Sequence, residues 1–209
     1  MKNYAFYILL LTFSNLFSQN DLKVEQLLDK VSFNIDQSTS YSMNFSYIID
    51  DDIAQKRKGN IIISKNKYIL EFLGVKQISD SNFIYTIVPE NQEVMISKIQ
   101  KEDEENISPS NILKFYRQGY EIEMDQLKVE SGLSIQFLKL TPNLSDSEIS
   151  HIFLGININN NNIYKVIEVG KNNSKTMLKI ENISYNLKIN EDAFDFKEDD
   201  YEGYYIEKI

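Results

Sequence analysis

Residues 41–47 read Tyr-Ser-Met-Asn-Phe-Ser-Tyr, and this stretch decides the fold class. Its odd positions are large and apolar, whereas its even positions are small or polar. An alternation of period two is typical of an antiparallel strand with one buried face, because successive side chains of a strand point to opposite faces. The sequence therefore predicts a half-buried antiparallel strand here.

Strand patterns continue along most of the chain. Ten further candidates lie at 58–64, 67–73, 75–79, 83–88, 93–99, 120–124, 133–140, 149–158, 163–169 and 175–185. Turn residues separate them, as in a meander of hairpins. About eleven strands are more than a flat open sheet usually tolerates, so the sheet should curl and acquire a concave face. We expect a mainly β protein of the α+β class.

Two helices are expected beside the sheet. The first covers 21–36, where apolar residues share one stripe at helical spacing: Val24, Leu27, Leu28, Val31 and Ile35. Ser108 and Pro109 open a second, short helix that ends at Gly119. The concave face of the sheet is either filled by these helices or left as a cavity.

The N-terminal 18 residues have the pattern of a secretory signal peptide. Lys2 supplies a positive charge, residues 5–13 are apolar, and Ser18 precedes Gln19 at a plausible cleavage point. We expect an exported protein whose mature part, 19–209, is a single domain. The 209 residues show no linker, fixed-period repeat or internal domain boundary.

Composition argues for a binding protein rather than an enzyme. The chain has no cysteine, a single histidine (His151) and a formal net charge of −9. These values leave no thiolate chemistry, little room for a histidine metal centre, and no basic footprint for a nucleic acid. Acidic runs at 50–52, 102–105 and 198–200 lack the ligand spacing of a calcium loop. We therefore expect no catalytic residues, metal or cofactor, although a glycosidase-type carboxylate pair stays open because such pairs meet only in space.

Several segments, taken in order, resemble the LolA family of periplasmic carriers of outer-membrane lipoproteins. The most specific is 78–94, which is similar to the family's S-D-G strand followed by a P-x-x-x-E-V turn. The other matching segments are 41–46, the hairpin 58–63 with 67–72, Ser108-Pro109, Leu140-Thr141-Pro142 and the closing F-x-F of 192–196. Together they span nearly all of residues 20–197.

Three features depart from the family pattern. Asp80-Ser81 stands where the family has Asp-Gly, so serine occupies a position that favours positive φ. Lys65 or a neighbour replaces the arginine that helps to hold the family's lid closed, and lysine lacks the planar fork of that arginine. The acidic, aromatic tail 198–209 differs from the usual Pro-Gly ending.

The resemblance implies an incomplete half-barrel closed by helices over a hydrophobic cavity. It also implies a monomeric periplasmic chaperone that takes acylated lipoproteins from an inner-membrane ABC release complex to an outer-membrane acceptor. Burying one methylene stabilises by about 0.8 kcal/mol, so exposing several acyl chains to water would cost on the order of tens of kcal/mol. Two alternatives remain: a half-barrel for another lipid or envelope component, and an envelope hydrolase that uses carboxylates on the concave face.

The pattern of the strands names candidate residues for that cavity. The predicted lining consists of Met43, Phe45 and Tyr47 on one strand, Tyr68, Leu70 and Phe72 on a second, and Phe83, Tyr85 and Ile87 on a third. The predicted lid is the helix at 109–118, with Ile112, Leu113 and Phe115 facing inward.

Overall fold

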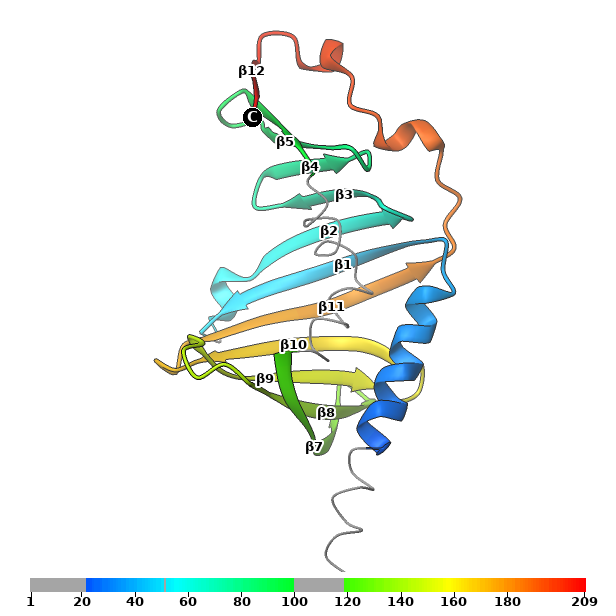
Figure 1. Ribbon diagram of the computed structural model, residues 1–209, viewed down its shortest axis with the longest axis vertical. Helices are drawn as coiled ribbons and strands as arrows, with labels where there is room; N and C mark the ends of the chain where they lie inside the picture. Colours follow the sequence, from blue (N-terminus) through cyan, green and yellow to red (C-terminus); the bar gives the residue numbers. More distant parts are fainter. Residues whose placement is uncertain (1–21, 51, 100–118) are drawn as a thin grey trace, which may run out of the picture.

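The computed structural model describes residues 22–50, 52–99 and 119–209 (Figure 1). In these residues, twelve strands form one open sheet in the order β12-β6-β5-β4-β3-β2-β1-β11-β10-β9-β8-β7. The strands are β1 (Ser40–Ile49), β2 (Arg57–Ser64), β3 (Lys67–Phe72), β4 (Val75–Ser79), β5 (Phe83–Val88), β6 (Glu93–Lys98), β7 (Tyr120–Glu130), β8 (Leu133–Pro142), β9 (Ile149–Asn157), β10 (Asn162–Gly170), β11 (Lys175–Tyr185) and β12 (Tyr205–Lys208). The expected mainly β, curled sheet is confirmed.

The sheet consists of two meanders that meet in its middle. One runs from β1 outward to β6, and the other returns from β7 to β11, which pairs with β1. Neighbouring strands are antiparallel except for β12, which lies parallel to β6. All eleven predicted strands fall on observed ones, whereas β12 was not expected from the sequence.

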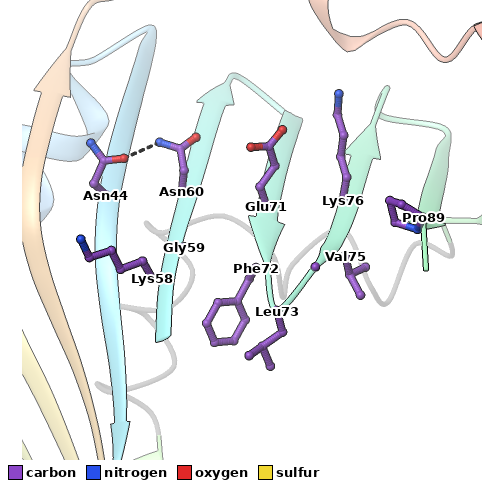
Figure 2. Close-up of a pocket in the computed structure, with 11 residues that line it drawn as sticks. Asn44, Lys58, Gly59, Asn60, Glu71, Phe72, Leu73, Val75, Lys76 and Pro89 are labelled. Atoms are coloured by element: carbon purple, nitrogen blue, oxygen red, sulfur yellow. Dashed lines mark hydrogen bonds between the residues drawn. The ribbon is translucent and has the colours of Figure 1, made fainter. Parts of the chain in front are cut away.

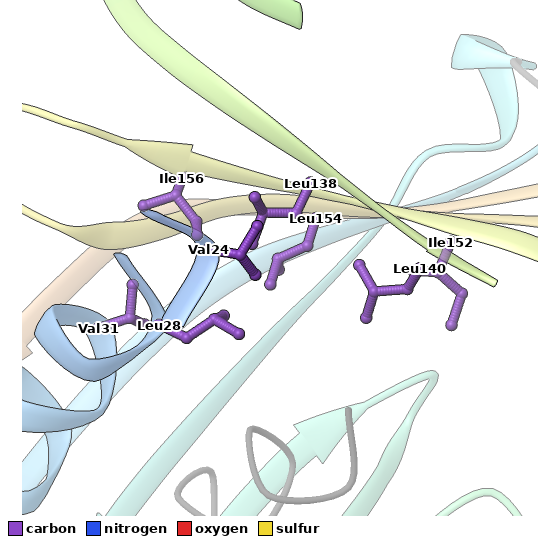
Figure 3. Close-up of a cluster of buried hydrophobic side chains, with 8 residues drawn as sticks. All are labelled: Val24, Leu28, Val31, Leu138, Leu140, Ile152, Leu154 and Ile156. Carbon is purple, nitrogen blue, oxygen red and sulfur yellow. The ribbon is translucent and has the colours of Figure 1, made fainter. Parts of the chain in front are cut away.

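The helix at 22–36 packs on one side of the sheet (Figure 1). Val24, Leu28 and Val31, at helical spacing, are buried against apolar side chains of β8 and β9 (Figure 3). Fully burying such a side chain stabilises by about 1.5–3 kcal/mol, so these three hold the helix on the sheet. The β8 and β9 partners are Leu138, Leu140, Ile152, Leu154 and Ile156.

Two predicted segments, the signal peptide at 1–18 and the lid helix at 109–118, lie outside the described residues. The same holds for the predicted lid side chains Ile112, Leu113 and Phe115. The expected closure of the cavity by helices is therefore not confirmed, and only the helix at 22–36 is described beside the sheet.

Paired residues on adjacent strands share a face of the sheet, so the register sorts the side chains into two sets. We call the side on which the helix packs the helix face and the opposite side the outer face. Tyr41 and Met43 of β1 lie on the helix face with their partners on β11, Tyr185 and Ile183. A register shift after Asn44 inserts an extra residue into β11 and keeps Ile180 on the helix face.

The C-terminal segment returns along the outer face of the sheet. It contains two 3-10 helices, η2 (Glu191–Phe194) and η3 (Glu198–Tyr201), and ends in β12. Phe196 stacks between Tyr85 of β5 and Tyr201, with ring-centroid distances of 4.5 and 5.1 Å. By pairing with β6, β12 covers an edge that would otherwise present free N–H and C=O groups.

The turn between β4 and β5 explains how serine replaces the family's glycine. Ser81 adopts φ +84°, in the left-handed region. The Asp80 carboxylate accepts hydrogen bonds from the backbone N–H groups of Asn82 and Phe83, at 2.7 and 2.8 Å, and from the Tyr85 hydroxyl at 2.9 Å. These three bonds stabilise a backbone conformation that costs more for serine than for glycine.

Candidate functional site

An apolar cavity of about 200 Å³ lies between the helix and the helix face of the sheet. The helix supplies Val31 and Ile35, and the remaining wall comes from β1, β10, β11 and the turn before β10. Those wall residues are Tyr41, Met43, Asn161, Asn162, Ile163, Val166, Leu178, Ile180, Ile183 and Tyr185. No charged side chain is among the described residues that line this cavity.

Polar side chains of the wall make hydrogen bonds to one another and to the helix. The Tyr185 hydroxyl donates to Asn162 Oδ1 at 2.8 Å. The Asn34 side-chain amide, on the helix, donates to the Asn160 carbonyl at 2.8 Å and to Asn162 Oδ1 at 3.3 Å. These bonds join the helix to the turn before β10 and leave a neutral, largely apolar interior.

Tyr41 is the exception among these polar groups. Its side chain is 5% exposed and its hydroxyl has no hydrogen-bond partner among the described residues. Burial, to which nearby Tyr185 adds, raises the pKa of the Tyr41 hydroxyl well above its usual range. Burial also raises the pKa of Tyr185 to about 12. Both phenols therefore stay protonated and neutral across physiological pH.

Aromatic rings extend the apolar helix face beyond the cavity. The Phe72 ring lies 5.4 Å from that of Phe45 and 5.7 Å from that of Tyr47, measured between centroids. Phe45 covers Gly59 of β2 so closely that a Cβ atom there would lie 2.3 Å from its ring. Glycine at this position leaves room for the far end of the ring against the backbone.

The structure separates the nine predicted lining residues into three groups. Met43 alone lines the cavity. Phe45, Tyr47, Tyr68, Leu70 and Phe72 share its face through the β1–β2 and β2–β3 register. Phe83, Tyr85 and Ile87 are corrected, because their partners across β4 and β6 place them on the outer face. Strand β5 is apolar on both sides, and the outer side is covered by the C-terminal segment.

Sequence reasoning missed most of the cavity wall. The contribution of β11 is hidden because the extra residue near Asn182 breaks the period-two pattern between Ile180 and Ile183. The alternation of Leu178 and Ile180, and the aromatic residue at Tyr41, were usable signals. The contribution of Asn161 and Asn162 comes from a turn and from the first residue of β10, and these polar residues leave no apolar signature in the sequence.

A second hollow, of about 580 Å³, is more open and more polar (Figure 2). Asn44, Asn60, Glu71 and Lys76 stand side by side on four adjacent strands and point away from Phe72. Asn60 donates from its side-chain amide to Asn44 Oδ1 at 2.8 Å. Charged and amide groups of this kind suit a solvated surface, so the smaller apolar cavity is the candidate site for a hydrophobic ligand.

The described part of the chain does not assemble a metal centre. No group of three or more histidine, aspartate or glutamate side chains that could hold a metal occurs in these residues. His151 contacts the Ser150 hydroxyl at 3.1 Å and the edge of the Phe153 ring, with centroids 4.9 Å apart. Over the same residues, no helix has both the length and the apolar character needed to span a bilayer.

Comparison with known proteins identifies relatives in structure alone. No protein-family model and no curated protein sequence matches this chain. An uncharacterized conserved protein from Thermus thermophilus superposes with a TM-score of 0.62 at 10% identity, over 90% of this chain and 99% of that one. LprF from Mycobacterium bovis gives 0.50 at 11% identity, over 82% and 97%.

A LolA superfamily protein from Nitrosomonas europaea is a weaker match, with a TM-score of 0.40 at 11% identity, over 82% of this chain and 97% of that one. Sequence identities this low show a shared fold and do not show a shared function. The LolA-like fold that the sequence resemblance implied is confirmed for this chain.

Proposed function

We propose that this protein is a periplasmic carrier that binds the acyl chains of lipoproteins on the helix face and moves them from the inner to the outer membrane. The observation that carries the proposal is the cavity between the helix and β1, β10 and β11, whose lining has no charged residue among those described. The aromatic surface of Phe45, Tyr47 and Phe72 continues the same face. An apolar surface of this kind offsets the cost of keeping acyl chains out of water.

The size of the cavity indicates how the carrier must work. Pockets for drug-sized ligands usually measure about 300–1,000 Å³, whereas this one measures about 200 Å³. The described cavity therefore holds part of one acyl chain, and loading several chains requires the helix and sheet to separate. Such a change lets binding and release differ by a modest free energy.

The partners follow from the carrier role. We expect the donor to be the inner-membrane lipoprotein-releasing ABC complex and the acceptor to be an outer-membrane protein, with this chain acting as a monomer. Depletion of the protein in its source cell should then leave lipoproteins in the inner membrane. Normal sorting after complete depletion would contradict the shuttle role.

Binding is tested with a diacylated lipopeptide and the same peptide without acyl chains. Native mass spectrometry should show a one-to-one complex with the acylated form only. Ile180→Trp fills the cavity from its β11 wall and should abolish the complex. Asn182→Trp, on the outer side of the same strand, is the matched control and should bind as the wild type does. Equal loss in both variants, or no complex with the wild type, would contradict the proposal.

Two other functions would use the same face. A half-barrel that binds a different lipid or envelope component would show that component, and no lipoprotein, in lipid extracts of protein purified from its source. A hydrolase would require two carboxylates on the helix face, and none lines the cavity in the described residues. We therefore favour binding without catalysis.

A further inference from the structure

Tyr41 carries an unpaired polar group in the wall of an otherwise neutral cavity. Its side chain is nine-tenths or more buried, and its hydroxyl makes no hydrogen bond to a described residue. A buried hydroxyl without a partner is costly, and proteins rarely retain one. The other tyrosine of the wall, Tyr185, has its hydroxyl bonded to Asn162. The Tyr41 hydroxyl is itself enclosed in the present arrangement, so a ligand would reach this unused donor once the helix and the sheet separate for loading.

The ligand group that suits Tyr41 is an acceptor. A phenol with a raised pKa keeps its proton and donates a hydrogen bond to an oxygen of the ligand. The choice of acceptor depends on charge, because the described lining contains no lysine or arginine. A carboxylate or phosphate placed there would lose its hydration without gaining a counter-charge. The net charge of −9 adds a long-range field that also disfavours anions.

We infer that Tyr41 is a specificity-determining residue that donates a hydrogen bond to a neutral carbonyl of the ligand, and that this bond, in a lining without a described counter-charge, selects esterified acyl chains over free fatty acids. The inference rests on the proposed function, because it concerns the same cavity. Apolar side chains such as Ile180 and Leu178 hold the chain whatever its end group. Tyr41 binds the carbonyl of a neutral ester, and the lack of a counter-charge in the described lining disfavours a charged carboxylate.

The test measures displacement of Nile red, a neutral dye, by methyl palmitate and by palmitate. The wild type should bind the ester more tightly than the acid at pH 7.5, and acidification toward pH 5 should improve palmitate binding alone. Tyr41→Phe should weaken ester binding about 3- to 10-fold, the value of one hydrogen bond. Its melting temperature should stay the same or rise, because the hydroxyl it removes makes no described bond.

Tyr164→Phe is the matched control. Tyr164 is a buried tyrosine of a separate cluster with Ile135 and Phe137 and does not line the cavity, so ester affinity should be unchanged. Equal affinity for ester and acid, or wild-type ester affinity in Tyr41→Phe, would overturn the role of Tyr41 and leave the proposed function standing. Failure of the wild type to bind the dye or either lipid would overturn the proposed function, and this inference with it.

Discussion

Substitution of Gly59 by alanine tests how the aromatic part of the helix face is packed. A Cβ atom at Gly59 would lie 2.3, 2.6 and 2.9 Å from three carbons of the Phe45 ring. Ordinary carbon contacts begin near 3.5 Å, so the ring must shift by about 1 Å. Overpacking of this kind destabilises by about 1–3 kcal/mol, whereas the lower conformational entropy of the unfolded chain with alanine stabilises the fold by about 0.4–1 kcal/mol. We expect a net loss of about 1–2 kcal/mol.

Urea unfolding of Gly59→Ala, Phe45→Ala and the double variant measures this effect. Phe45→Ala alone should cost about 3–5 kcal/mol. In its background Gly59→Ala should be neutral or slightly stabilising, because the obstructing ring is gone. Gly119→Ala is the control, since a Cβ there meets no described atom within 4 Å. A Gly59→Ala variant as stable as the wild type, or equally destabilised with and without Phe45, would refute the packing.

Three further predictions concern the outer face and its charges. Phe196→Ala should lower the free energy of unfolding by about 2–4 kcal/mol, because it removes two stacked ring pairs; wild-type stability in urea would contradict this. Burial raises the pKa of the Asp80 carboxyl, but hydrogen bonds from Phe83, Asn82 and Tyr85 outweigh it and lower that pKa overall. Asp80 therefore stabilises the fold above its unfolded pKa of about 3.9, and this contribution is lost as the pH falls through the lowered value. The difference in the free energy of unfolding between pH 7 and pH 3 should therefore be smaller in Asp80→Asn than in the wild type. Burial, with Lys139 nearby, lowers the pKa of His151. Proton NMR of this single histidine should therefore give a titration midpoint below 6.5, and Lys139→Gln should raise that midpoint. The free energy of unfolding should fall as acid protonates the ring.

The fold could be predicted from sequence where each strand's pattern depends on its own neighbours. The alternation at 41–47 and the turns between hairpins are local, and the structure places strands there. β12 could not be predicted in this way. Its four residues lie in an acidic tail, and they form a strand because they pair with β6, more than one hundred residues away.

The candidate site was less predictable than the fold, for two physical reasons. The period of a strand shows which residues share a face but does not show which face is inside when both are apolar. For this reason the strand pattern predicts Tyr85 and Ile87 in the cavity, whereas Phe196 and Tyr201 of the C-terminal segment cover them on the outer face. A single extra residue in β11 then inverts the alternation that would have revealed Ile183.

The most direct test of acyl-chain binding on the helix face uses two adjacent residues of β1. Met43 lines the cavity, whereas Asn44 points to the opposite side and bonds to Asn60. A photocrosslinking amino acid at each position, irradiated with a radiolabelled diacylated lipopeptide, reports which face holds the chains. We predict strong labelling at position 43 and background labelling at position 44. Equal labelling at both positions, or labelling at position 44 alone, would contradict acyl-chain binding on the helix face.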